Sequence, residues 1–226
     1  MLKFFKAFTL AEVLLVMAII GVTAMLAMPT VNRNLEEKRV VSALRKIYPE
    51  LETAYNAMVK DYGKPAEWDV PASATTADMN ALLKDRISRY LNVLTDCGTG
   101  TGCFTSLSNI DSSESYIKFL LKDGSSVAFL LYPMETIIDQ SDMFYSDEYD
   151  CNGDMGKVLV DVNGSKGENK REYDIFEFFM CYAEGIVPAG IRHLHPGYTT
   201  GWVLKIGNRD YLKCEDLDFD TKRTCK

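Results

Sequence analysis

Residues 8–28 read FTLAEVLLVMAIIGVTAMLAM and form a long apolar run from Phe8 to Met28. As a helix this run would extend roughly 31 Å, which is enough to cross the hydrocarbon core of a bilayer. Glu12 is the only ionisable residue in it. A carboxylate at mid-membrane costs on the order of 2.5–3.5 kcal/mol. A plain anchor has no need for that carboxylate, so the sequence predicts a polar partner for Glu12.

The segment in front of this run, MLKFFKA, carries two lysines and no acid. A short basic leader, a Phe directly after it and a Glu four residues beyond that Phe resemble the amino terminus of the type IV prepilin family, which includes the pseudopilins of type II secretion. The continuation to about Tyr62 and the carboxy-terminal segment WVLKIGNRDYLKC are similar to pilin-like proteins labelled type II secretion proteins. The leader of this family usually ends in Gly, and here the small residue Ala7 stands in that place.

The resemblance implies that a prepilin peptidase cuts between Ala7 and Phe8 and methylates the new amino terminus. In an assembled filament, Glu12 would neutralise the amine of Phe8 of a neighbouring subunit. Other pilin-like subunits and an ATPase-driven assembly platform are the further partners it implies. The chain would be held in the inner membrane with its head extracytoplasmic, and after assembly in a periplasmic or extracellular filament. A type IV pilus and a type II secretion pseudopilus share this amino terminus, so both remain open.

The same run also has the features of an ordinary secretory signal peptide. It has a basic start, an apolar centre and a small-residue cleavage site at Val22-Thr23-Ala24. A membrane-tethered extracytoplasmic binding domain, adhesin-like and unable to polymerise, is the alternative from another functional class. The length of the run, the carboxylate of Glu12 and the helical pattern that follows favour the filament subunit.

Residues 29–63 continue the helical pattern with a different composition. Apolar residues recur at steps of three and four and predict one buried stripe: Val40, Leu44, Ile47, Leu51, Ala54, Met58 and Tyr62. Gly63 and Pro65 then predict the end of the helix. The predicted organisation is therefore a leader (1–7), a transmembrane and assembly helix (8–28), its amphipathic continuation (29–63) and a head (64–226).

The head is predicted to be α+β. Thr75 and Asp78 indicate a capping box, and the apolar residues behind it predict a helix: Met79, Leu82, Leu83, Ile87, Tyr90, Leu91 and Leu94. Three pairs of strand-like runs follow: Tyr116–Leu121 with Val127–Tyr132, Val158–Val162 with Tyr173–Phe179, and Trp202–Ile206 with Tyr211–Lys213. Consecutive strands joined by short turns predict an antiparallel sheet. The expected architecture is a long helix, membrane-spanning in its first half and amphipathic in its second, packed on this sheet in a pilin-like manner.

All six cysteines follow the apolar run: Cys97, Cys103, Cys151, Cys181, Cys214 and Cys225. An even number in a domain delivered across a membrane favours disulfides. Zinc is the competing interpretation, but the sequence contains no C-x-x-C pair. Because short loops close at the lowest entropic cost, the preferred pairing is sequential: Cys97–Cys103, Cys151–Cys181 and Cys214–Cys225.

Oxygen-bearing side chains alternate along one loop, at Asp161, Asn163 and Ser165, and continue at Asn169. Alternating oxygen ligands are typical of calcium loops, so these four residues are candidate calcium ligands. The glycine expected at the sixth place of such a loop is Lys166. The alternative interpretation is the end of a strand followed by an Asn-Gly turn.

The net charge of −7 argues against a general affinity for nucleic acid, although Lys166, Lys170 and Arg171 cluster in one loop. The sequence contains no G-x-S-x-G, no Walker loop and no H-E-x-x-H. It therefore predicts a structural subunit rather than an enzyme, with no cofactor apart from the calcium hypothesis.

Overall fold

The computed structural model describes residues 9–105, 109–141, 151, 153–164, 166, 169–192, 194 and 197–225, without the side chains of residues 26–31 and 138–141. The chain divides into two compact units, Met1–Arg39 and Val40–Lys226. The first unit contains the apolar part of the first helix. The second contains the rest of that helix, the sheet and the remaining elements.

Helix α1 runs from Leu10 to Tyr62. Within the second unit its apolar stripe is buried, with exposed fractions of 0–1% at the positions Leu44, Ile47, Leu51 and Met58. The helix ends at Gly63, whose positive φ of 75° favours glycine. The Gly63 N–H donates to the carbonyl oxygen of Val59 at 2.8 Å. The predicted amphipathic helix and its end are therefore confirmed.

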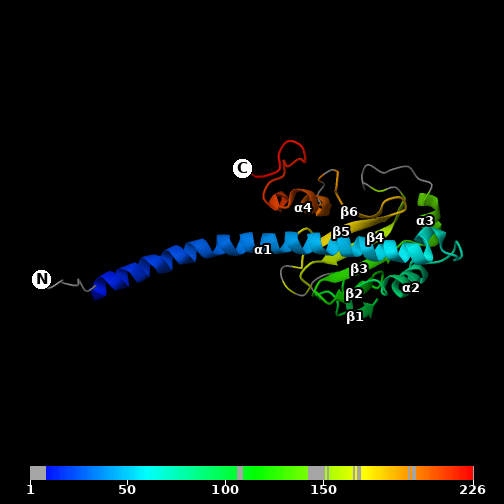
Figure 1. Ribbon diagram of the computed structural model, residues 1–226, viewed down its shortest axis with the longest axis horizontal. Coiled ribbons are helices and arrows are strands. Elements are labelled where there is room, and N and C mark those ends of the chain that lie inside the picture. Colours follow the sequence, from blue (N-terminus) through cyan, green and yellow to red (C-terminus); the bar gives the residue numbers. More distant parts are fainter. Residues whose placement is uncertain are drawn as a thin grey trace. The chain divides into compact units, whose positions relative to one another are not determined.

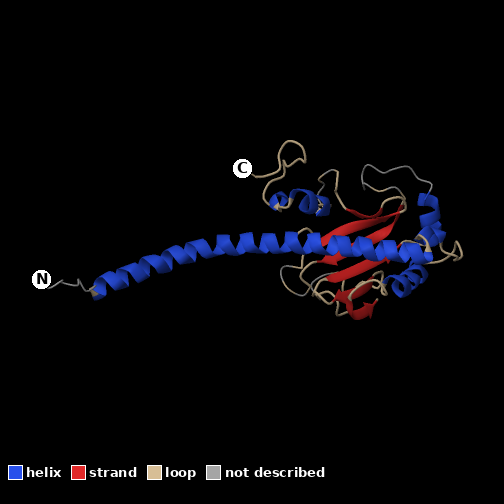
Figure 2. Ribbon diagram, viewed as in Figure 1, coloured by secondary structure: helices blue, strands red, loops and turns tan. Residues whose placement is uncertain are grey.

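One antiparallel sheet of six strands has the spatial order β1-β2-β3-β4-β5-β6 (Figure 1). The strands are β1 (Val93–Gly98), β2 (Ile117–Leu121), β3 (Ser126–Leu131), β4 (Asp154–Asp161), β5 (Ile175–Cys181) and β6 (Gly185–Pro188). Each strand pairs with its neighbour in sequence, so the sheet is a meander. Figure 2 shows the second half of α1 crossing this sheet, which confirms the predicted α+β class.

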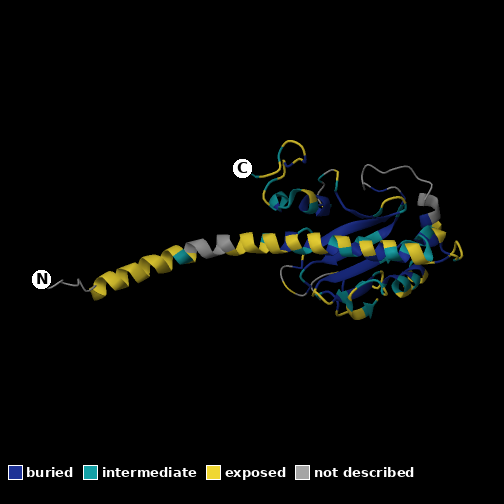
Figure 3. Ribbon diagram, in the orientation of Figure 1, coloured by how far each residue is buried: buried dark blue, intermediate teal, exposed yellow. Residues whose placement is uncertain are grey.

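The strands sort their side chains between two faces of the sheet, as the period of two requires. The inner face packs against α1: Phe129 and Phe178 belong to the same buried cluster as Leu44 and Leu51. Figure 3 shows the central strands β3, β4 and β5 as mostly buried. The opposite, outer face carries charged residues among smaller apolar clusters: Lys118, Asp154, Lys157, Asp161 and Glu177. Most charged side chains of the sheet therefore lie on the face away from α1, whereas Asp96 of β1 lies opposite the inner residue Phe119 and pairs with Lys84 of α2 at 3.0 Å.

Helix α2 (Thr76–Ile87) begins at the predicted capping box. The Asp78 carboxylate accepts from the Thr75 N–H at 2.9 Å, and the Thr75 hydroxyl accepts from the Asp78 N–H at 3.3 Å. The predicted continuation of this helix to Leu94 is wrong, because Val93 pairs with Leu121 as the first residue of β1. Leu94 is 61% exposed on this strand instead of buried in a helical stripe. Pairing with a strand more than twenty residues away overrides the local helical spacing.

The predicted hairpin near the carboxy terminus is also wrong. Residues Thr200–Ile206 form helix α4, and Asp210–Leu212 form a 3-10 turn. The adjacent residues Trp202 and Val203 are both fully buried, which the alternation of a half-buried strand does not allow. Gly207 ends α4 with a φ of 83°. The strand β6 and the helix α3 (Met134–Ser141) are present in the structure but were not predicted from the sequence.

Three disulfides join the cysteines in the predicted sequential pairs, Cys97–Cys103, Cys151–Cys181 and Cys214–Cys225. The first joins the end of β1 to the segment 99–116, which packs on the outer face of the sheet. The second joins the residue at position 151 to the end of β5, and the third closes a carboxy-terminal loop.

Candidate functional site

The first candidate site is the beginning of α1, where Glu12 takes part in a second capping box. The Thr9 N–H and hydroxyl both donate to Oε2 of Glu12, at 2.9 and 2.8 Å. The Glu12 N–H donates in return to the Thr9 hydroxyl at 3.2 Å. This reciprocal arrangement satisfies two donors at the start of a helix. Glu12 therefore has a partner within its own chain, which the sequence interpretation did not foresee although the T-x-x-E spacing was its signal.

The helix surface beyond Glu12 is apolar and exposed. Ten large apolar side chains in this segment are 42–79% exposed: Leu10, Val13, Leu14, Leu15, Val16, Met17, Ile19, Ile20, Val22 and Met25. A helix that is apolar on all sides is stable in apolar surroundings, such as lipid or the helices of other chains. The predicted processing residues Ala7 and Phe8 lie outside the described residues.

Within the part of the chain that the structure describes, no helix is long and apolar enough to span a membrane.

The second candidate site is the connection between β4 and β5, where three of the predicted calcium ligands gather near Asp174. The Asn163 side-chain amide donates to Oδ2 of Asp174 at 3.3 Å, and the Asn169 N–H donates to the same oxygen at 2.9 Å. The Asn163 N–H donates to Oδ1 of Asp161 at 3.1 Å. The fourth predicted ligand, Ser165, lies outside the described residues. Asp174 was missed because its position beside Val162, whose N–H donates to the Asp174 carbonyl oxygen at 3.0 Å, follows from the pairing of β4 with β5.

Two oxygens at this site lack hydrogen-bond partners among the described residues. They are Oδ2 of Asp161, whose side chain is fully buried, and Oδ1 of Asn163. Burial is the largest cause that raises the pKa of Asp161, to about 7, and the nearby Asp174 carboxylate adds to it. A proton on Asp161 or a hard cation between these oxygens would compensate this burial.

The donor set suits Ca²⁺, which prefers carboxylate and amide oxygens. Among the described residues, no group of three or more His, Cys, Asp or Glu side chains could hold a metal ion. Asp174 already accepts three N–H groups, from Asn163, Asn169 and Lys170. Asp161 and Asn163 therefore have the free oxygen capacity, and Asp174 would complete a site built from two carboxylates and an amide.

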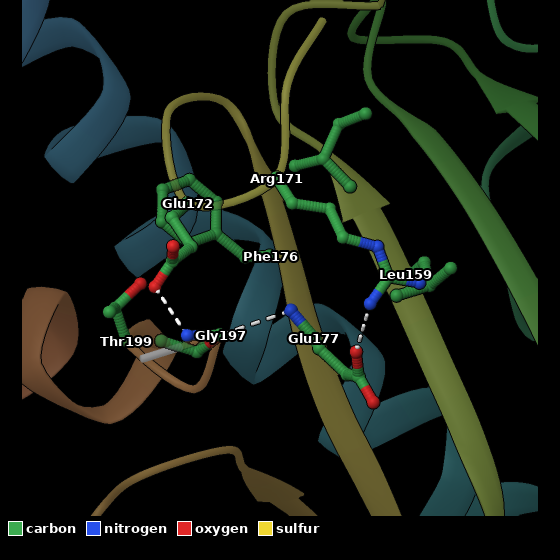
Figure 4. Close-up of a pocket in the computed structure, with 9 residues that line it drawn as sticks. Leu159, Arg171, Glu172, Phe176, Glu177, Gly197 and Thr199 are labelled. Atoms are coloured by element: carbon green, nitrogen blue, oxygen red, sulfur yellow. Dashed lines mark hydrogen bonds and ion pairs between the residues drawn. The ribbon is translucent and has the colours of Figure 1, made fainter. Parts of the chain in front are cut away.

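A buried ion-pair cluster lies beside this turn on the outer face. The carboxylate of Glu177, whose side chain is 5% exposed, accepts from Lys157 at 2.9 Å and from Arg171 at 2.8 Å. Figure 4 shows Arg171 reaching Glu177, and Gly197 donating through its N–H to Glu172. The small pocket between these residues measures about 10 Å³, which is room for about one water molecule. The cluster and the Gly197–Glu172 hydrogen bond therefore join β4, β5 and the segment before α4.

No protein-family model, curated protein or solved structure matches this chain. The function has to be inferred from the amino-terminal motif and from the geometry of the two candidate sites.

Proposed function

We propose that the chain is a pilin-like structural subunit of a type IV pilus or of a type II secretion pseudopilus. A prepilin peptidase would cut between Ala7 and Phe8, and the segment Phe8–Met28 would sit in the inner membrane before it joins the helices of other subunits. The observation that carries the proposal is the leader–Phe–x3–Glu motif in front of a helix whose surface is apolar and exposed from Leu10 to Met25. The three disulfides support a head in an oxidising, extracytoplasmic compartment.

Glu12 would serve two partners in this scheme. In the separate chain the Thr9 N–H and hydroxyl bind its carboxylate. In the filament the Phe8 amine of a neighbouring subunit would bind it as well, because an ionised carboxylate has about four acceptor sites. An amine left without its partner in the filament core costs on the order of 3–5 kcal/mol. Repeated along a polymer, this cost should prevent assembly or greatly reduce it.

Three substitutions separate the filament role of Glu12 from its capping role. Gln can replace Glu in a capping box, so Glu12→Gln keeps the cap and removes the charge. Glu12→Leu removes both. Thr9→Val removes the capping hydroxyl, at about 1 kcal/mol, and keeps the charge. We expect normal cleavage after Ala7 in all three, measured by mass spectrometry, and sheared filaments from Thr9→Val but not from either Glu12 variant.

The alternative is a membrane-tethered, adhesin-like binding domain that never polymerises. It predicts that the wild-type chain stays with the membranes and that the Glu12 variants behave like the wild type. A normal yield of filaments from Glu12→Gln would overturn the neutralisation role. A wild-type chain that is uncut, or cut after Ala24, would overturn the family assignment.

A further inference from the structure

A cleft of about 440 Å³ opens between the segment 109–116 and the β4–β5 turn. The buried residues Ile110 and Ile175 contribute apolar lining. Lys170 and Arg171 line it as exposed cations. None of the described residues that line the cleft is acidic. In a chain with a net charge of −7, the cleft is therefore a local positive hollow with an apolar lining.

The positive charge of Lys170 is available to bind an anionic group in this cleft. Its Nζ lies 4.4 Å from the centre of the Tyr173 ring, and it has no ion-pair partner among the described residues. Arg171 shares its charge with Glu177, whose carboxylate is also paired with Lys157. Two cations thus share the single carboxylate of Glu177, so Lys157, Arg171 and Glu177 together carry a net positive charge, and Lys170 adds to it.

The same chain carries an exposed acidic ridge, Glu215–Asp220, in its carboxy-terminal loop (Figure 3). Acidic and apolar residues alternate in this segment, EDLDFD. Leu217 and Phe219 are 8% and 4% exposed and pack in the cluster next to α4, so the carboxylates point outward. Glu215 and Asp220 have no ion-pair partner within the part of the chain that is described.

We propose that the cleft receives the acidic ridge of a second copy of this chain. Carboxylates such as those of Glu215 and Asp220 would meet Lys170 and Arg171, and this complementarity would fix the register between neighbouring heads. The cleft and the ridge are different surfaces of one chain, so the contact is heterologous and can repeat from copy to copy, as a helical filament requires. This inference rests on the proposed function, because assembly into a filament is what brings the heads together. The contact itself does not involve Glu12.

The test places the photo-cross-linker p-benzoylphenylalanine at Asn109, an exposed residue that lines the cleft, in the full-length chain in its own cell. Mass spectrometry of the cross-linked dimers should identify peptides of the acidic ridge. We expect Lys170→Glu, or Glu215→Lys combined with Asp220→Lys, to lower the dimer yield roughly fivefold. All three changes together should restore it, because they exchange the charges.

The matched control is Lys122→Glu, which reverses an exposed lysine without an ion-pair partner among the described residues. An equal loss from this control, a failure of the charge exchange to restore the yield, or cross-links to a different protein would each overturn the head contact. Normal filaments from Glu12→Gln, with rescue by the charge exchange, would refute the role of Glu12 alone. Filaments that need Glu12, with unchanged cross-linking in Lys170→Glu, would refute the head contact alone.

Discussion

Among individual residues, Asp161 couples the fold most directly to pH. Its side chain is fully buried, and one of its oxygens has no hydrogen-bond partner among the described residues. Burial raises its pKa from the ordinary value of 3.8 to about 7. Between these two values the native state binds a proton that the unfolded state does not, so stability increases as the pH falls through about 7. A shift of this size corresponds to at most about 4 kcal/mol.

We expect the melting temperature to rise when the pH is lowered from about 8 to about 5.5. Asp154, whose pKa burial raises to about 6, acts in the same direction. Asp161→Asn should raise the melting temperature at the higher pH and flatten the pH dependence, because the amide carries no charge. Calorimetric scans across this range provide the measurement, with the exposed residue Asp220 changed to Asn as the control. A pH dependence as steep in Asp161→Asn as in the wild type would contradict the assignment.

The same residue tests the calcium hypothesis. A ligand that binds only the native state stabilises it by about 2.7 kcal/mol at a hundred times its Kd. Calcium should therefore raise the melting temperature, and more at about pH 8 than at about pH 5.5, because protons compete for Asp161. Asp161→Asn and Asp174→Asn should each remove the effect. An identical melting temperature in EDTA and in millimolar calcium at the higher pH would end the hypothesis and leave protonation as the compensation of Asp161.

Among the elements, β2 fixes the segment 99–116 on the outer face through a buried lysine. Lys118 is fully buried, and its Nζ donates to the carbonyl oxygens of Asp111 and Ser113, each at 2.8 Å. The Asp111 carboxylate accepts from the N–H groups of Gly102 and Phe104, at 2.9 and 3.1 Å. Burial lowers the pKa of Lys118, against the influence of nearby carboxylates. One ammonium group and one carboxylate thus help the Cys97–Cys103 disulfide to hold a segment whose described residues form no strand or helix.

Lys118→Met should lower the free energy of unfolding, because it removes the hydrogen bonds that the lysine donates as well as its charge. The methionine fills the space but leaves backbone carbonyls buried without a donor, and we expect a loss of about 2–4 kcal/mol in the free energy of unfolding. Denaturant titration measures the loss, and limited proteolysis should cut first within residues 99–116. Lys122→Met, at an exposed turn, should stay within about 0.5 kcal/mol of the wild type. A loss no larger than that of the control would show that the hydrogen bonds from Lys118 to the carbonyl oxygens of Asp111 and Ser113 do not stabilise the fold.

Helices and strands that follow from the local spacing of apolar residues could be predicted from the sequence. Elements that depend on pairing or packing with distant segments could not. The stripe of α1 and the pair of strand-like runs Tyr116–Leu121 and Val127–Tyr132 follow from local spacing, and both are present. Leu94 and Trp202 were misplaced because their environment is set by distant partners: the pairing of β1 with β2, and the packing of α4 beside the carboxy-terminal loop. Short apolar runs fit a helix or a strand equally well until such a partner is known.

For the whole molecule, the site residues that were predicted lie in a local sequence pattern, and those that were missed depend on distant partners. Asp161 and Asn163 stand in a recognisable local pattern. Asp174 and Glu177 become parts of a site only through the pairing of β4 with β5 and through cations from neighbouring segments. Lys118 reads as an ordinary strand lysine, although its ammonium is enclosed by backbone carbonyls.

The sequential disulfides also allow an order in which the chain can be oxidised from its amino end. The first cysteine pairs with the second, the third with the fourth and the fifth with the sixth, so in a chain that is oxidised from its amino end each pair is complete before the next begins. No earlier bond has to be broken again, and the slow thiol exchange of mispaired chains is avoided. The stripe of α1 has to wait, because Leu51 packs in one cluster with Phe178 of the late strand β5. Until that strand is made, the helix stripe lacks part of the sheet it packs on, so the head cannot complete its core before β5 is present.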